Sequence, residues 1–246
     1  MSVLLAIGAT DSSGGAGLSA DLETFNSLGD DCLLCITAVT AQSNSSYIDT
    51  HAVPSSMIDA QLRSIGDQKI DAVKIGMLPN TETIEIVSDF ISQISCKNVV
   101  LDPVMRSSSG GRLFMEESIE SLQGVLFPHI TLITPNLAEA NTLTKESVVN
   151  FEGLPGLAKK CIKMGVGSVL IKGGHISEKP CRDLLFSKNQ QLILENKRIS
   201  GGTEVRGTGC RLASAIAHYL ANEEISLECA VKRANKYLHG YILDNV

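Results

Sequence analysis

The stretch Asn98-Val-Val-Leu-Asp-Pro-Val-Met105 joins a short, apolar run to an acidic residue and a proline. An apolar run that does not alternate with polar residues is typical of a strand with both faces buried, as in a parallel sheet. Ser168-Val-Leu-Ile171 has the same character and is followed by Lys172 and two glycines. These runs predict a parallel sheet that is covered by helices on both faces.

Similar runs recur along the chain and alternate with segments of helical periodicity. Strands are predicted at 3–7, 32–40, 71–75, 98–102, 130–134 and 168–172, with a hairpin at 183–186 and 191–194. Helices are predicted at about 16–28, 55–67, 80–93, 116–126, 136–143, 153–165, 207–221 and 226–242. No repeat or linker interrupts the pattern, so we expect one α/β domain over residues 1–246, a three-layer α/β/α fold with a mainly parallel sheet.

Composition excludes several classes of function. The chain has 246 residues, 43% of them hydrophobic, and a formal net charge of -6. Because no basic surface is available to neutralise a phosphate backbone, we expect no nucleic-acid partner. The run Met1–Gly8 is short and lacks a basic flank, and no segment reaches the roughly 20 apolar residues of a membrane span. We therefore expect a soluble protein that acts on a small molecule and has no membrane partner.

The cysteines indicate a reducing compartment. Seven of them are scattered through apolar segments. An odd number without a secretory signal favours free thiols and a cytoplasmic location. Cys32-Leu-Leu-Cys35 has the spacing of a redox motif, but it lies inside a predicted strand, where cysteine is typical of a core.

Polar and glycine residues follow each predicted strand at the edge where open α/β sheets bind their ligands. These segments are Gly8–Gly17, Thr40–Ser43, Lys74–Met77, Asp102–Met105, Thr134–Glu139 and Lys172–His175. Within the first, Gly15-Ala-Gly-Leu-Ser-Ala20 has the spacing of a dinucleotide fingerprint, but it begins too far beyond the strand to favour that function. A Walker A loop is absent from the sequence.

The segment Glu204-Val-Arg-Gly-Thr-Gly-Cys-Arg211 leads directly into an apolar helix. Free N–H groups at a helix start favour an anion, so Gly207, Thr208 and Gly209 predict an anion hole. The alternative is a simple turn with Thr208 as the helix N-cap. Beside two arginines, Cys210 is expected to have a lowered pKa and to act as a base or a nucleophile.

Taken together, these motifs resemble the hydroxymethylpyrimidine/phosphomethylpyrimidine kinases of thiamine biosynthesis, which belong to the ribokinase-like superfamily. The matching segments run in order over nearly the whole chain: Thr10–Asp21, Thr40–Gln42, Val73–Met77, Leu101–Val104, Ile133–Ala140, Ile171–His175, Asp183–Phe186 and Gly207–Cys210.

The resemblance implies ATP- and Mg²⁺-dependent phosphorylation of a pyrimidine hydroxymethyl group and then of the monophosphate. It implies that Gln42 recognises the pyrimidine and that Asp21, Met77 and Val104 shape its pocket. It places Cys210 at the catalytic anion hole, where relatives that phosphorylate sugars carry an aspartate. It also implies that Asp102 and Glu139 bind Mg²⁺ and that Asn136 and Lys172 bind the nucleotide. Kinases of this fold commonly form homodimers.

Two cations distinguish this chain from the motif that the family usually shows, His-Gly-Thr-Gly-Cys-Thr. Arg206 and Arg211 replace neutral positions, and we expect one of them to contact phosphate. The alternative for Arg211 is an outward position on the helix, paired with an acid. Ser43-Asn-Ser-Ser-Tyr47 also departs from the usual residues after Gln42. The sequence therefore does not specify the lid of the pocket or the exact substrate.

Two other functions remain open at the level of sequence. Pyridoxal kinases have similar cysteine-bearing motifs and phosphorylate a hydroxymethyl group on another small heterocycle. A binding or sensing module that retains the pocket but has lost turnover belongs to a different class. The presence of Asp102, Glu139, Lys172 and Cys210 favours an enzyme over a sensor.

Overall fold

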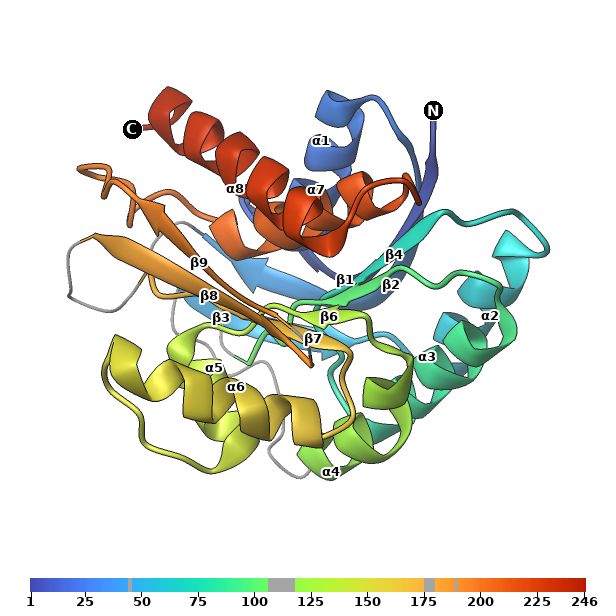
Figure 1. Cartoon of the computed structure of the whole chain (residues 1–246). Helices are drawn as coiled ribbons and strands as arrows, with labels where there is room; N and C mark the ends of the chain where they lie inside the picture. The colour runs from blue at the N-terminus through green and yellow to red at the C-terminus, as the bar shows by residue number, and fades with distance from the viewer. Residues whose placement is uncertain (44–45, 106–117, 175–179, 189) are drawn as a thin grey trace.

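A computed structural model describes residues 1–43, 46–105, 118–174, 180–188 and 190–246. In this part of the chain, nine strands form a single sheet in the order β3-β2-β1-β4-β5-β6-β7-β8-β9 (Figure 1). The strands are β1 (Val3–Asp11), β2 (Asp31–Gln42), β3 (Tyr47–Ala52), β4 (Ala72–Ile75), β5 (Val99–Leu101), β6 (Leu132–Ile133), β7 (Ser168–Ile171), β8 (Cys181–Ser187) and β9 (Gln191–Asn196).

The pairing of strands confirms the mainly parallel sheet. All neighbours from β2 through β1 and β4 to β7 are parallel, and β8 and β9 add the predicted hairpin in antiparallel pairing. The antiparallel edge strand β3 was not predicted. Its sequence, Tyr-Ile-Asp-Thr-His-Ala, is exposed or half-buried along its length and carries no apolar run.

Helices cover both faces, as the sequence predicts. α1 (Gly17–Leu28), α7 (Thr208–Leu220) and α8 (Leu227–Asp244) lie on one face (Figure 1). The other face carries α2 (Ser55–Ile65), α3 (Thr81–Gln93), α4 (Ile119–Ser121), α5 (Leu137–Thr144) and α6 (Leu154–Lys163). The result is the expected three-layer α/β/α architecture. Among the described residues, no helix combines the length and apolar character that crossing a bilayer requires.

The helix predicted over 116–126 is divided. Residues 116 and 117 lie outside the described residues, and the remainder contains α4 and a π-helical turn at Leu122–Leu126, which a 3₁₀ turn at Phe127–His129 follows. Gly124 and Pro128 are the two residue types least compatible with a continuous α-helix, which explains the irregular winding.

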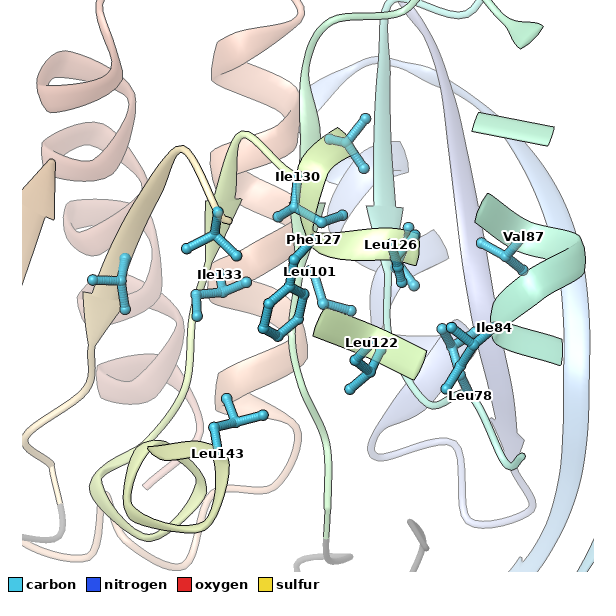
Figure 2. Packing of buried hydrophobic residues seen from close by; sticks show 14 of the residues in the cluster. Leu78, Ile84, Val87, Leu101, Leu122, Leu126, Phe127, Ile130, Ile133 and Leu143 are labelled. Carbon is cyan, nitrogen blue, oxygen red and sulfur yellow. The ribbon is translucent and has the colours of Figure 1, made fainter. Parts of the chain in front are cut away.

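Separate apolar clusters fill the two interfaces between the sheet and its helices. Figure 2 shows the larger one, in which Ile84 and Val87 of α3 belong to the same cluster as Leu101 of β5, Leu126 and Phe127. On the opposite face, Phe25 of α1 and the alanines of α7 pack over β1 and its neighbours. The small side chains of α7 permit a close approach to the sheet, and this holds the beginning of α7 above the strand ends.

The order of the strands locates the site. After β1 the chain adds β2 and β3 on one side, then returns to place β4 on the other side of β1. In open α/β sheets, ligands bind beyond the carboxyl ends of strands at such a change of direction. The crevice between the ends of β1 and β4 is therefore the expected binding position.

Candidate active site

A cavity of about 810 Å³ lies at this edge of the sheet. Its volume is within the range of about 300–1,000 Å³ that is typical of small-molecule sites. All the candidate site residues from the sequence line it except Arg211: Asp21, Gln42, Met77, Asp102, Val104, Asn136, Glu139, Lys172, Arg206, Gly207, Thr208, Gly209 and Cys210. The strand ends thus converge as the sequence predicts.

The start of α7 provides a row of backbone N–H groups. Gly207 is the N-cap residue, with φ of 69°, and Thr208, Gly209 and Cys210 form the first turn. The alternative that Thr208 caps the helix is wrong. A Cβ atom on Gly207 would lie 2.2 Å from the carbonyl oxygen of Gly15, so both the backbone angle and the close approach require glycine. The first amides of a helix have no partner within it, and here they border the cavity.

Cys210 does not have the lowered pKa that its neighbours in the sequence suggest. Burial raises the pKa of its thiol to about 11; the charge of Lys74 acts in the opposite direction, while Asp21 and Asp102 add to the increase. The flanking arginines do not activate the thiol, because each forms an ion pair with an acid on another element. At neutral pH the group is therefore a thiol.

Alkylation measures this property of Cys210 directly. We expect its reaction with iodoacetamide to be slow at neutral pH and to increase with pH up to about 11, because the thiolate is the reactive form. Peptide mass spectrometry separates this residue from the other cysteines. A Cys210 peptide that is fully alkylated at neutral pH before the peptide of the half-buried Cys229 would contradict the protonated state.

A buried ion pair borders the amides of α7 on one side. Lys172 Nζ donates to Asp102 Oδ1 at 2.9 Å, and Thr134 Oγ1 donates to the same oxygen at 3.2 Å. A Cβ atom on Gly209 would lie only 3.1 Å from Lys172 Nζ. The ammonium group is thus held beside the anion hole, at the end of β7.

Asn136 and Glu139 form a capping box at the start of α5. The Asn136 side chain accepts from the Glu139 amide, and Glu139 Oε2 accepts from the Asn136 amide at 2.8 Å. Burial raises the pKa of Glu139 to about 7, although Lys172 lowers it. The helix start therefore fixes a carboxyl group close to the Lys172–Asp102 pair.

The acidic residues fit Mg²⁺ that is bound together with phosphate. Within the described ranges, no three His, Cys, Asp or Glu side chains gather to hold a metal by themselves. Mg²⁺ is usually bound by one or two carboxylates, water and substrate phosphates rather than by a cage of protein ligands. Asp102 and Glu139 supply two carboxyl groups at one wall of the cavity, which matches that mode.

A second ion pair lies deeper, beneath Cys210. Lys74 Nζ donates to Asp21 Oδ2 at 2.7 Å, and Ser214 Oγ donates to Asp21 Oδ1 at 2.8 Å. The side chains of Lys74 and Asp21 are 1% and 0% exposed. The sequence shows Lys74 in a strand without revealing its partner, and it predicts Asp21 as part of the substrate pocket. In the structure Asp21 does line the cavity, but both its oxygens are already occupied by these contacts.

The opposite wall is mainly apolar. Met77, Ala9 and Ala38 form a small buried cluster, with Val104 and Tyr47 packed against it. At its edge Gln42 ends β2, and its side-chain amide donates to Thr40 Oγ1 at 3.1 Å. An apolar wall with one amide at its border is a suitable surface for a flat polar heterocycle.

The two arginines differ in position. Arg206 lines the cavity, with Nη2 3.2 Å from Asp11 Oδ2. Arg211 is buried between helices: it forms an ion pair with Glu23 of α1 at 2.7 Å and lies over the ring of Tyr241 of α8. The alternative prediction for Arg211 was an ion pair on the outer face of the helix. The ion pair with an acid is present, but the side chain is buried, and it does not line the cavity.

Sequence reasoning missed the wall formed by β9 and α8. Asn196 ends β9, Lys197 and Arg198 follow it, and Asn235 and His239 come from α8. The Lys-Arg pair after the predicted strand was a usable signal, whereas nothing in the sequence shows which face of α8 meets the cavity. His175 and the segment 44–45 after Gln42 lie outside the described residues.

Comparisons with known proteins agree with this arrangement. The hydroxymethylpyrimidine/phosphomethylpyrimidine kinase of Haemophilus influenzae is 37% identical over 244 residues, which cover 97% of this chain and 90% of that protein. A crystal structure of phosphomethylpyrimidine kinase from Clostridium difficile superposes with a TM-score of 0.85 at 32% identity, covering 98% of this chain and 100% of the other.

Pyridoxal kinases share the fold. The ADP complex of Bacillus subtilis pyridoxal kinase has a TM-score of 0.86 at 31% identity and covers 96% of this chain and 90% of its own. The family profile described as phosphomethylpyrimidine kinase matches residues 11–246. From this match and the identity to its curated members, the chain belongs to the phosphomethylpyrimidine kinase family.

Proposed function

We propose that this protein transfers the γ-phosphoryl group of ATP to the hydroxymethyl oxygen of 4-amino-5-hydroxymethyl-2-methylpyrimidine, and then to the resulting monophosphate, in thiamine biosynthesis. One observation carries the proposal: a single cavity combines the amides of α7, the Lys172–Asp102 pair and the apolar wall at Met77. Relatives that are 36–37% identical over most of the chain are named for both phosphorylations.

The residues divide between the two substrates. The pyrimidine lies against Met77 and Val104, with Gln42 at its polar edge. The triphosphate lies along the opposite side, by Asn136 and Lys172. This division brings the hydroxymethyl group to the amides of Thr208, Gly209 and Cys210, where the transferring phosphoryl group is received.

Phosphoryl transfer depends mainly on positioning and on stabilising charge. The amides of α7 and the ammonium group of Lys172 face the transferring group and neutralise its oxygens. Asp102 and Glu139 would hold Mg²⁺, which supplies further positive charge to the phosphates. Because the transition state is loose, the attacking hydroxyl keeps its proton until late. A protonated Cys210 is compatible with this order: the thiol does not have to ionise before transfer, and the hydroxyl proton passes to an oxygen of the transferred phosphoryl group as its bond to ADP breaks.

The assay for this function compares acceptors. Purified protein with ATP and Mg²⁺ is expected to form ADP with the pyrimidine and with its monophosphate, and to form much less with pyridoxal. Pyridoxal is the second candidate because the Bacillus subtilis pyridoxal kinase has the same fold. ADP formation with pyridoxal alone would reassign the substrate, and none with any acceptor would favour a sensor.

Replacing Gln42 with alanine tests recognition of the pyrimidine. We expect KM for the pyrimidine to rise by up to about tenfold, the equivalent of one lost hydrogen bond, with KM for ATP unchanged. Gln93→Ala, on the exposed face of α3, is the matched control. Equal increases in both KM values for Gln42→Ala would contradict a specific role at the pyrimidine.

The cysteines indicate where in the cell the protein acts. All seven cysteines are free thiols, which supports the cytoplasm as the location. We propose a homodimer because kinases of this fold commonly form homodimers. Gel filtration with light scattering measures the oligomeric state.

A further inference from the structure

The loop after β1 and the segment before α7 press against each other at the mouth of the cavity. They are far apart in the sequence, yet a Cβ atom on Gly207 would meet the carbonyl oxygen of Gly15 at 2.2 Å and Cα of Ala16 at 3.3 Å. The Cys210 sulfur also accepts a hydrogen bond from the backbone amide of Gly17. The direction of the first amides of α7 therefore depends on how this contact is held.

Arg206 connects the same two segments through its side chain. Its Nη2 lies 3.2 Å from Asp11 Oδ2, and its Nη1 donates to Ser13 Oγ. The aliphatic part and Nη1 lie over Gly15, where an added Cβ atom would be 3.3 Å from Nη1. The guanidinium group thus spans the contact between the loops and reaches the end of β1.

Asp11 is a rigid anchor for this contact. Its Oδ1 accepts from the amide of Ser13 at 2.9 Å and from Ser13 Oγ at 2.8 Å, and its carbonyl accepts from the amide of Gly14 at 2.9 Å. Its side chain is only 1% exposed, against 11% for Arg206. A buried carboxylate needs a partner, and Arg206 supplies the neutralising charge.

We propose that Arg206 is a positioning residue, which acts through Asp11 and Ser13 to hold the amides at Gly207–Cys210 in the geometry for phosphoryl transfer. This inference rests on the proposed kinase function. It is an alternative to the expectation that Arg206 binds phosphate directly, because each terminal nitrogen donates to one partner, Asp11 or Ser13. A small displacement of a catalytic group is enough to reduce turnover strongly, while the pyrimidine wall at Met77 is untouched.

A double-mutant cycle tests the inference. Arg206→Gln and Asp11→Asn are each expected to lower kcat by tenfold to about 100-fold with KM for the pyrimidine unchanged. The double variant is expected to be no slower than the slower single variant, because both changes break the same contact. Arg206→Lys retains the charge and is expected to recover part of the loss. Arg63→Gln, which breaks an exposed pair with Asp59 on α2, is the matched control.

Two outcomes would overturn the inference. Losses that multiply in the double variant would show that Arg206 acts without Asp11. A higher KM for ATP or for the monophosphate at unchanged kcat would show direct binding of phosphate. If Asp11→Asn does not fold, Ser13→Ala takes its place: it is expected to lower kcat in the wild-type background and to have no effect beside Arg206→Gln.

Hydrogen exchange separates this inference from the function on which it rests. Arg206→Gln and Asp11→Asn are each expected to speed exchange of the Arg211 amide, which donates to the Gly207 carbonyl at 2.9 Å, with no further increase in the double variant. This readout needs no substrate. Unchanged exchange in both single variants would refute the role of Arg206 even in an active kinase, whereas an inactive wild-type protein would refute the kinase function alone.

Discussion

Lys172→Met is expected to lower kcat by about 100- to 1,000-fold, the effect of removing one preformed group that stabilises developing charge. The ammonium group is fixed by Asp102 at 2.9 Å and borders Gly209 in the first turn of α7. Methionine keeps much of the side-chain volume but removes the charge. Steady-state kinetics with the pyrimidine and saturating ATP measure the loss.

A matched surface variant controls for the loss of a lysine. Lys160→Met on α6 removes an exposed ion pair with Glu146, and we expect unchanged kcat. Thermal unfolding of Lys172→Met identifies any loss of folded protein, since Asp102 loses its partner. A folded Lys172→Met variant with wild-type kcat would remove Lys172 from the catalytic site.

Lys74→Met is expected to reduce the free energy of unfolding by about 3–5 kcal/mol, because it leaves the buried Asp21 without its cation. The pair is 2.7 Å apart, and neither side chain is exposed by more than 1%. Urea or guanidinium unfolding at neutral pH measures the change. The double variant Asp21→Leu with Lys74→Met is the control, since replacing both partners by apolar residues is expected to restore much of the stability.

The loss in Lys74→Met should depend on pH in a defined direction. Burial raises the pKa of Asp21 from its usual value, while Lys74 lowers it. Removing Lys74 raises the pKa of Asp21 further. An acid that binds its proton more tightly in the folded state destabilises that state as pH rises from the usual aspartate range towards the folded pKa. The loss should therefore be smaller at mildly acidic pH than at neutral pH; the same loss at both would show that Asp21 is not the group responsible.

The parallel strands and their helices could be predicted because each is encoded locally. Runs such as Val99–Leu101 are apolar on both faces and are bounded by polar residues. The edge strand β3 could not be found in this way, since it pairs only with β2 and its side chains are largely exposed. These six residues form a strand because they pair with β2, and their own sequence has no strand pattern.

The site was predictable as far as the strand ends determine it, and no further. Asp102, Asn136 and Lys172 were expected at one edge because parallel strands end there together. The protonation states of the site side chains could not be predicted, because the pKa of a group such as Cys210 depends on burial and on partners far away in the sequence. For the same reason the sequence left open whether Arg206 or Arg211 contacts phosphate, whereas in the structure Arg211 packs between helices.

Product analysis tests most directly whether this protein performs both phosphorylations of the pyrimidine. The protein is incubated with 4-amino-5-hydroxymethyl-2-methylpyrimidine, ATP and Mg²⁺, and the products are followed by mass spectrometry over time, with pyridoxal in a parallel reaction. We predict that the pyrimidine monophosphate appears first and is then converted to the diphosphate by the same protein. Phosphorylation of pyridoxal without any phosphorylated pyrimidine would contradict the account.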